Sequence, residues 1–501
     1  MRRPGGLVLA LLMCSGALPL FVSPASAVPA FARRYGVACS TCHDAWPHLN
    51  PTGMSFKMSG YRRLNGADLQ PTTKDMELAV GALQIPSIPP LAIRLTTGFD
   101  WRRDHRTASD GSRASQTGSS LDLEDVDIFL ATPLGKHLSA FLEFPLFETH
   151  AEAKDGPTGP AEANNTGIAS RRDIQFTTES PAFEMGKLIW NDLLPDAILP
   201  TDSFNIEAGV DQLPTPFSAE ANRLSVNPYL IYRRRALDLL SPTPVGTLLV
   251  GNEGDRLLRL GEPQIQIALM GLVVPFGTLA DLAKPETLSI QYNVGLTNGS
   301  NLNSDPNTEK DFFGRIAIRW WGQVLGVFGY YSPDIYDDFQ RFDGSTAAAP
   351  GVGIFSGTRA RNSFYGAGPD LTIDLRQFEI PVWIENELLF NRESNPTGFG
   401  KRFEWWGGFS QLYLALPKHV VAYARYDWIE GDHFNDTALG GVTGPMSPHE
   451  WDAVVGIQWY VLENLRIGPE YLYRKYTNDG GRPVHEKLTE DFFSFRASIA
   501  F

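Results

Sequence analysis

Alternating apolar and polar residues dominate the sequence from about Leu91 to its last residue, Phe501. Successive side chains of a β-strand point to opposite faces, so a period of two indicates strands with one apolar and one polar face. The clearest apolar faces are Leu91, Ile93, Leu95, Phe99 and Trp101; Leu288, Ile290, Tyr292, Val294 and Leu296; Ala453, Val455, Ile457 and Trp459; and Leu465, Ile467, Tyr471 and Tyr473. The pattern predicts strands rather than helices, and hence a mainly β chain.

The connections between these strands alternate between short and long over the C-terminal half. Short links lie near Gly322-Gln323, Gln377-Phe378, Pro417-Lys418 and Leu462-Glu463, and long links rich in Gly, Asn, Asp and Ser occupy 298–310, 332–361, 430–450 and 478–489. Outer-membrane barrels have short turns on one side of the membrane and long loops on the other. A soluble sandwich has no reason to keep this alternation, so we predict a transmembrane antiparallel β-barrel.

The same rule gives a strand count. About ten strands fit between Thr287 and Phe501. Six more begin near Leu91, Leu121, His137, Glu184, Phe204 and Gln264. The prediction is therefore a barrel of about 16 strands, give or take about two. Proline and arginine interrupt the pattern at 214–260, which is a long loop, a constriction of the lumen or an extra hairpin.

The first 27 residues have the features of an export signal. Arg2 and Arg3 precede an apolar run, and the small residues Ala25-Ser26-Ala27 follow it, so we predict a signal peptide at 1–27. Removal of Arg2 and Arg3 changes the formal net charge from −14 to −16, which argues against nucleic acid as a partner. No later stretch is long and apolar enough for a membrane-spanning helix.

The last nine residues, 493–501, alternate and end on the aromatic Phe501. This ending resembles the C-terminal strand by which bacterial outer-membrane barrels are recognised for insertion. An even number of strands places both ends of the barrel on the periplasmic side. We therefore expect the protein in the bacterial outer membrane, in contact with its lipid, with the segment before the barrel on the periplasmic side or within the lumen.

A Cys-x-x-Cys-His motif at Cys39, Cys42 and His43 lies shortly after the predicted signal. A redox dithiol of the thioredoxin kind needs a βαβ context that this sequence lacks, and a structural zinc site needs four ligands. Covalent attachment of one c-type haem fits better, because two thiols at this spacing bond the porphyrin vinyl groups while His43 is the proximal iron ligand. Both mature cysteines belong to this motif, since Cys14 lies in the signal.

The sequence leaves several candidates for the distal iron ligand. Met54 and Met58 follow the motif closely, and methionine opposite histidine would raise the haem potential. The alternative is that both methionines are soft apolar filler against the porphyrin. His48 is too near His43 in sequence to reach the opposite face, and Met76 is farther away.

Ionisable groups recur on the polar faces of the predicted strands. They form the wall of a solvated pore, or some of the carboxylates hold a hard cation such as Fe(II). The residues are Arg94, Asp100, Glu143, Glu207, Arg315, Arg319, Glu385, Glu387, Glu470, Arg474 and Arg496. Glu385 and Glu387 point the same way from one strand. The segment before the barrel is too small for a core of its own, and we expect it to plug or line the periplasmic half of the lumen.

Residues 30–43, 47–53 and 56–61 resemble the monohaem cytochrome-porin fusions of iron-oxidising bacteria. The resemblance is close in this segment and extends to the rest of the chain by architecture. It implies a signal peptide at 1–27, a monohaem cytochrome c segment at 28–80 and a porin-like barrel at 90–501. Cys39, Cys42 and His43 match the family's haem attachment and proximal ligand, whereas no family methionine maps onto Met54 or Met58.

The resemblance implies outer-membrane electron transfer, in which extracellular Fe(II) or another reduced donor passes electrons through the haem to a periplasmic carrier such as a soluble cytochrome. As an enzyme the chain would be an iron:cytochrome c oxidoreductase, and otherwise an electron carrier. No catalytic residue beyond the haem is expected, because the sequence contains no hydrolytic or phosphate-binding motif. The alternative function is a haem-bearing diffusion porin or solute transporter.

Overall fold

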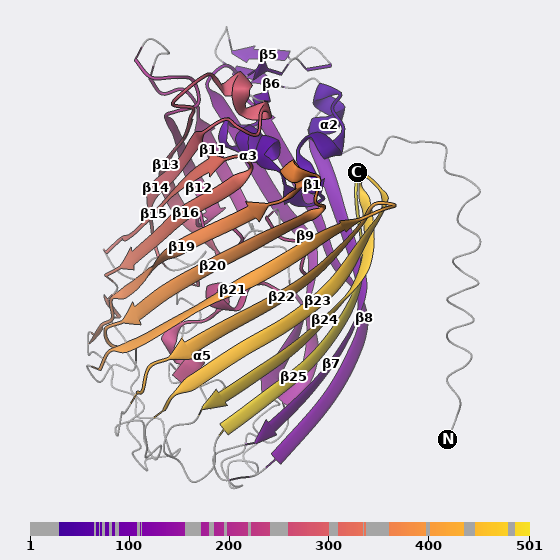
Figure 1. The fold of residues 1–501 in the computed structure, drawn as a ribbon, viewed down its shortest axis with the longest axis vertical. Coiled ribbons are helices and arrows are strands. Elements are labelled where there is room, and N and C mark those ends of the chain that lie inside the picture. The colour runs from indigo at the N-terminus through magenta and orange to yellow at the C-terminus, as the bar shows by residue number, and fades with distance from the viewer. Residues whose placement is uncertain are drawn as a thin grey trace, which may run out of the picture.

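Figure 1 shows the computed structural model of the chain, a closed β-barrel that carries smaller segments inside it and at one end. The structure describes residues 30–64, 67–69, 71–72, 76–79, 83–85, 90–107, 111, 113–155, 172–179, 185–194, 198–218, 222–240, 259–299, 309–333, 335–336, 360–396, 401–434, 446–478 and 486–501. The predicted signal peptide at 1–27 lies outside the described residues.

Seventeen strands form the barrel in the described part of the chain, and all their pairings are antiparallel. They are β7 (Leu91–Thr107), β8 (Arg113–Pro133), β9 (Leu138–Asp155), β10 (Arg172–Glu179), β11 (Met185–Trp190), β12 (Asn205–Gln212), β13 (Pro263–Val273), β14 (Ser289–Thr297), β15 (Asp311–Trp320), β16 (Gln323–Ser332), β19 (Phe364–Asp374), β20 (Val382–Glu393), β21 (Phe403–Leu416), β22 (Val420–Gly431), β23 (Pro448–Leu462), β24 (Leu465–Asn478) and β25 (Glu486–Ala500). β10 and β11 pair with successive stretches of β9, so they share one position. The barrel therefore has sixteen strand positions, which confirms the predicted fold.

The barrel closes between its first and last strands. β25 pairs with β7 from Lys487 opposite Thr107 to Ala500 opposite Arg94. Beyond that register, the Phe501 N–H donates to the Ile93 carbonyl at 2.9 Å. The barrel thus begins and ends at the same rim, which is also the rim of the short links Trp321-Gly322 and 417–419. We call it the short-link rim.

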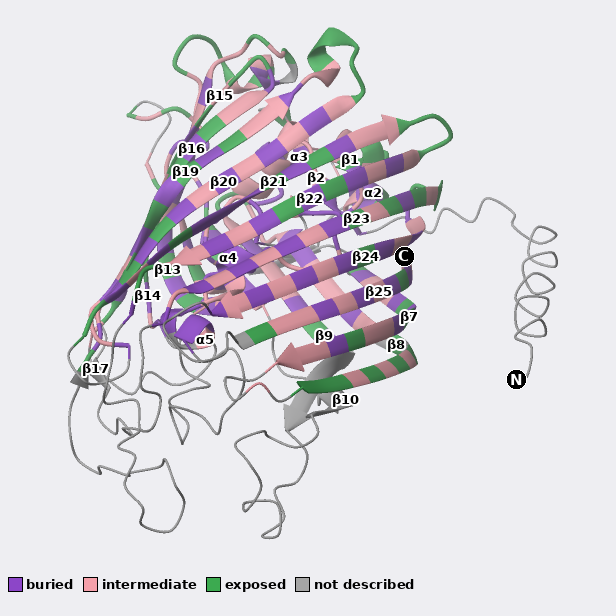
Figure 2. Cartoon of the chain, turned by 60° about the horizontal axis from the view of Figure 1, so that its bottom comes forward, coloured by how far each residue is buried: buried purple, intermediate pink, exposed green. Residues whose placement is uncertain are grey.

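Burial alternates residue by residue along the strands (Figure 2). Outward positions are exposed and apolar, whereas most inward positions are buried and many are charged. Exposed apolar side chains on the outer face include Ile316, Ile318, Leu325, Val327, Tyr426, Val455, Ile457 and Trp459. An apolar outer band around a closed antiparallel barrel is the surface that a lipid bilayer covers. The chain is therefore an outer-membrane barrel.

Helices long and apolar enough to cross a membrane are absent from the described residues.

The segment before the barrel consists of short elements. They are α2 (Ala30–Tyr35), the 3₁₀ turn η2 (Cys39–Thr41), β1 (His43–Ala45), β2 (His48–Leu49), α3 (Pro51–Met58), β3 (Arg63–Leu64), β4 (Ala67–Asp68), β5 (Met76–Ala79) and β6 (Leu83–Ile85). Asn50 caps α3, because its side-chain oxygen accepts from the Gly53 N–H at 2.9 Å, and Pro51 suits the first helical turn. Phe31, Tyr35, Phe56 and Tyr61 pack as one aromatic cluster. We call residues 30–64 the N-terminal segment.

A second segment enters the lumen from the connection between β12 and β13. It contains α4 (Leu230–Arg233) and α5 (Ala236–Leu240), and its described residues span 213–218 and 222–240. Leu230, Ile231 and Tyr232 are at most 2 % exposed and pack against barrel-wall side chains. Of the three interpretations of 214–260, the described residues support a constriction of the lumen. We call residues 213–218 and 222–240 the lumen insert.

Candidate functional site

Cys39 and Cys42 lie one helical turn apart, in a geometry set by a single 3₁₀ turn. The Cys42 N–H donates to the Cys39 carbonyl at 3.1 Å, and the Cys39 N–H donates to Glu463 Oε2 in the link between β23 and β24. Both thiols are free and partly exposed. Burial, followed by the neighbouring Cys39, raises the pKa of Cys42 to about 11, so the thiol is neutral and available for thioether formation.

His43 is held in the tautomer that a metal ligand needs. Its Nδ1–H donates to the Pro47 carbonyl at 3.0 Å, and since a carbonyl only accepts, Nε2 carries the free lone pair. Desolvation lowers the pKa of His43 to about 4, which keeps the imidazole neutral near pH 7. Two neutral thiols beside a neutral, oriented imidazole form a donor set that fits a covalently attached haem.

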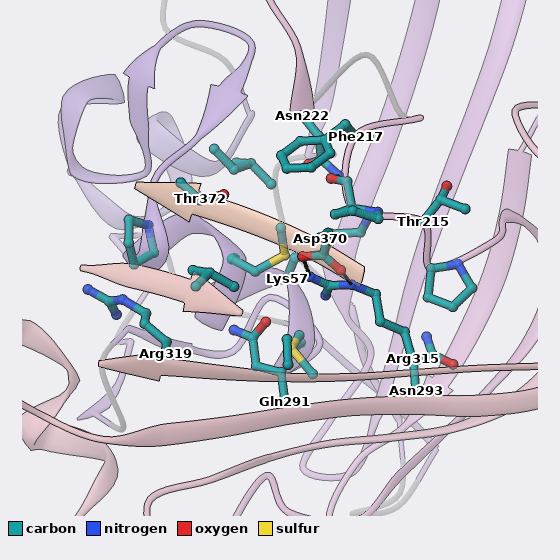
Figure 3. A pocket seen from close by; sticks show the side chains of 18 of the residues that line it. Lys57, Thr215, Phe217, Asn222, Gln291, Asn293, Arg315, Arg319, Asp370 and Thr372 are labelled. Atoms are coloured by element: carbon teal, nitrogen blue, oxygen red, sulfur yellow. Dashed lines mark hydrogen bonds and ion pairs between the residues drawn. The ribbon is translucent and has the colours of Figure 1, made fainter. Parts of the chain in front are cut away.

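Met54 and Met58 lie on α3 and line a cavity of about 220 Å³ in the lumen. Figure 3 shows this cavity with Lys57 of α3 pointing into it. Cys39, Cys42 and His43 are not among its lining residues. On the other side of α3, a Cβ at Gly53 would lie 2.1 Å from the Cys42 carbonyl oxygen, so the helix backbone packs directly on the motif. The structure thus places the two candidate methionines together on the lumen side of α3.

Groups of three or more His, Cys, Asp or Glu side chains that could hold a metal ion do not occur among the residues that the structure describes. The predicted holding of Fe(II) by wall carboxylates therefore stays a prediction without a described site.

The N-terminal segment docks at the short-link rim (Figure 1). Arg63 reaches Asp192 and Asp202, both at 2.9 Å, in the link between β11 and β12. Asp44 accepts from Arg376 at 2.9 Å, in the turn between β19 and β20. These ionic contacts were not predicted, because they join residues that are more than one hundred positions apart.

His48 makes the deepest of these contacts. Its Nε2 lies 2.7 Å from Glu385 Oε1, and its ring lies 6.0 Å from the Trp383 ring and 5.9 Å from the Tyr413 ring. Burial lowers the pKa of His48, but Glu385 and Asp44 outweigh it, so the pKa is raised. His48 therefore anchors the N-terminal segment on the wall through its contact with Glu385.

The ionisable residues that were predicted to face the lumen all lie on barrel strands. Many of them are buried by other side chains and are not solvated. Glu385 contacts His48, Glu387 accepts from the Tyr232 hydroxyl, and Glu470 accepts from the Val226 N–H at 2.8 Å. Wall ion pairs hold others: Arg94 with Asp127, Asp100 with Arg496, Arg315 with Asp370, Glu207 with Lys187, and Arg474 with Asp452. The Arg315–Asp370 pair lines the cavity (Figure 3). The two segments in the lumen thus replace water at much of this wall.

The lumen insert is fixed to the wall by buried polar contacts. Arg235 lies 2.8 Å from Glu393, and the Tyr229 hydroxyl donates to Gln411 Oε1 at 2.7 Å. Arg234 donates to Glu450 at 2.8 Å. The run Arg233-Arg234-Arg235 inside a non-strand region was the sequence signal for these contacts, although nothing in its spacing named the wall partners.

Comparison with known proteins finds no matching family model and no matching curated protein. Among solved structures, an anion-selective porin from Comamonas acidovorans aligns with a TM-score of 0.44 at 11% identity, over 82% of this chain and 99% of that chain. OprB of Pseudomonas putida aligns with a TM-score of 0.45 at 10% identity, over 81% and 94%. The channel DcaP of Acinetobacter baumannii aligns with a TM-score of 0.42 at 11% identity, over 82% and 97%. In each case the similarity is between the β-barrel of this chain and the β-barrel of the solved structure.

Proposed function

We propose that this protein transfers electrons across the outer membrane at one c-type haem attached to the N-terminal segment. The observation that carries the proposal is the donor set at the short-link rim: two free thiols in one turn beside an imidazole whose Nδ1–H is committed to the Pro47 carbonyl. Two partly exposed free thiols are open to oxidation. Covalent attachment of a haem gives both of them a role. When bound, the haem supplies a one-electron ferric–ferrous couple.

Each residue of the motif has a separate task. Cys39 and Cys42 would form the thioethers to the haem, and His43 Nε2 would bind its iron, while the Pro47 carbonyl fixes the imidazole ring. Met54 and Met58 are the candidates for the distal ligand. The contacts of Asp44, His48 and Arg63 with the barrel hold the motif in place at the rim.

Position explains why a barrel carries this motif. The hydrocarbon core of a bilayer is about 30 Å thick and blocks charged donors. A redox centre at one rim of the barrel is accessible to a soluble periplasmic carrier. Fe(II) or another dissolved reduced donor from outside the cell would enter the lumen at the other rim and approach the haem through it.

The test is stopped-flow absorbance of the purified protein mixed with Fe(II). We expect one haem per chain and stoichiometric reduction of that haem by Fe(II). His43→Ala should abolish the reduction. Heat-modifiable migration on a gel should show that the barrel of this variant is still folded. A chain purified from cells that attach c-type haem, but carrying none, would overturn the proposal. An Arg402→Gln variant, at an exposed position, is the matched control.

A diffusion porin is the second candidate. The closed barrel with charged inward residues favours it, since such barrels form aqueous channels. Conductance in planar bilayers separates the two functions. Open-channel current that is the same in wild type and in His43→Ala supports the porin, whereas a closed channel with haem reduction supports electron transfer.

A further inference from the structure

Outward-facing aromatic side chains form a band on the outer surface of the barrel, towards the rim opposite the short-link rim. The ring centre of Trp451 of β23 lies 6.0 Å from that of Tyr426 of β22 and 5.3 Å from that of Tyr473 of β24. Phe493 of β25 and Trp101 of β7 continue the band, because the strand register places them opposite each other. Such girdles lie at the membrane–water interfaces of outer-membrane barrels. The lipid headgroups therefore begin at this aromatic band.

Four cations lie beyond the aromatic band on the same outer face: Lys475 of β24, Lys487 of β25, Arg103 of β7 and Arg113 of β8. These strands are neighbours in the barrel (Figure 1). Arg103 follows Trp101 by two positions, so both side chains point outward, and the register places the other three cations on the same face. Arg103, Arg113 and Lys487 are exposed. We call these four residues the basic patch.

The basic patch extends farther from the membrane than an ordinary phospholipid headgroup does. Lys487 is six positions from Phe493, which is about 20 Å along a strand and about 15 Å in height for a strand tilted by 35 to 45°. Arg113 faces the same β7 residue as Lys487 from the other side, so their Cα atoms are about 10 Å apart. The polar layer of a typical bilayer is only about 5 to 8 Å thick on each side. Lys475 and Arg103, by contrast, lie directly next to the aromatic band.

The basic patch carries an excess of positive charge. Asp491 is the one carboxylate among the outward side chains that the structure describes on these four strands; it lies opposite Arg103 and accepts from the Tyr471 hydroxyl. Four cations less this one carboxylate leave three positive charges. On the next two strands, the outward Glu430 is in contact with His449. Within the described part of the chain, no carboxylate lies within ion-pair distance of the four cations.

Phosphate groups on an extended headgroup match this excess. A phosphate monoester carries about −1.5 to −2 at pH 7, so one leaves about one positive charge uncompensated, whereas two are sufficient. Arginine and lysine both bind phosphate oxygens strongly. The apolar outer surface next to the patch accommodates acyl chains, which free phosphate lacks. The chemistry therefore favours a lipid with sugars and more than one phosphate.

We propose that the basic patch binds a phosphorylated glycolipid whose acyl chains lie against the aromatic band and the apolar surface below it. One phosphate lies beside Lys475 and Arg103, at the membrane interface. A second phosphate, farther along the sugar headgroup, lies beside Lys487 and Arg113. Neither the haem nor electron transfer is needed for this binding.

The test uses the full-length protein in phosphatidylcholine vesicles that contain a small fraction of one spin-labelled lipid. The probes are lipid A, which has phosphates on a disaccharide, and a rough lipopolysaccharide, which has further phosphates on its core sugars. The motionally restricted part of the spectrum gives the association of each probe with the protein relative to phosphatidylcholine. Each cation near a membrane surface contributes about fivefold, so the loss of two weakens association by about tenfold or more.

Two double variants separate the two ends of the patch. Arg103→Gln with Lys475→Gln should weaken the association of both probes. Arg113→Gln with Lys487→Gln should weaken the association of the lipopolysaccharide and leave that of lipid A unchanged.

The control removes two exposed arginines that lie beside Glu404 at the same rim. Arg392→Gln with Arg402→Gln should leave the association of both probes unchanged. Heat-modifiable migration should show that every variant is folded.

Asp491→Asn tests the sign of the effect. It removes the carboxylate but keeps an oxygen that accepts from the Tyr471 hydroxyl, so association of both probes should rise, a change that a misfolded barrel would not produce. Association of the lipopolysaccharide that is equal in wild type and in both double variants of the patch overturns the proposal. Spin-labelled phosphatidylglycerol, with one phosphate and no sugar, that associates as strongly as the lipopolysaccharide also overturns it.

Discussion

His48 anchors the N-terminal segment through a buried, charged hydrogen bond to Glu385, and this makes docking depend on pH. The folded-state pKa of His48 is raised above the ordinary value of about 6.5. The stabilisation is therefore complete below that ordinary value and is lost as pH rises through the raised pKa. We expect limited proteolysis of the N-terminal segment to accelerate as pH rises above about 6.5.

Glu385→Gln isolates this residue-scale effect. Removing one partner of a buried pair costs on the order of 3 kcal/mol, so the segment becomes protease-sensitive at every pH and the pH dependence disappears. Glu404→Gln, at a more exposed carboxylate, is the control. A pH profile that survives in Glu385→Gln would show that another group controls docking.

Gly53 sets the distance between α3 and the Cys-x-x-Cys-His motif. A Cβ there meets the Cys42 carbonyl oxygen at 2.1 Å and Leu49 Cδ2 at 2.9 Å, so Gly53→Ala forces the helix and the motif apart. We expect a loss of about 1 to 3 kcal/mol in stability of the segment, seen as faster proteolysis and a smaller fraction of chains with attached haem. Gly329→Ala, where nothing lies within 4 Å, should leave both unchanged.

At the scale of elements, the lumen insert is held by charges that it shares with the wall. Arg235→Met leaves the Glu393 carboxylate, 1% exposed, without its arginine. We expect the insert to loosen and single-channel conductance in planar bilayers to rise above that of wild type. The exposed replacement Arg402→Gln should conduct as wild type does, and equal currents in Arg235→Met would mean that other residues close the lumen.

Strand positions were predictable because the bilayer imposes their pattern. Predicted starts near Leu91, His137 and Gln264 lie within a residue of β7, β9 and β13. β8 begins at Arg113 rather than near Leu121, and β10 was not predicted. Both misses are polar stretches, such as 113–120, which alternation in hydrophobicity does not mark.

Contacts between elements were largely beyond the sequence. The pattern placed Glu385 and Glu387 on one face, and the structure agrees, since both are at most 3 % exposed and inward. It did not show that one meets His48 and the other Tyr232, because those partners are 337 and 155 positions away. The Cys-x-x-Cys-His motif was readable from spacing alone, whereas its docking partners lie on the distant barrel strands and links.

At the scale of the whole molecule, the even number of strand positions determines which rim holds both ends of the barrel. Sixteen strand positions bring Leu91 and Phe501 to one rim, and the N-terminal segment docks there. We therefore predict that this is the periplasmic rim. An epitope inserted after Lys418, in a short link, should be labelled only after the outer membrane is permeabilised, whereas one inserted after Asp432, at the opposite rim, should be labelled on intact cells. Equal expression and heat-modifiable folding of the two tagged proteins provide the control. The reverse labelling would place the Cys-x-x-Cys-His motif outside the cell, where a periplasmic carrier has no access to it, and would exclude inward electron transfer at that rim.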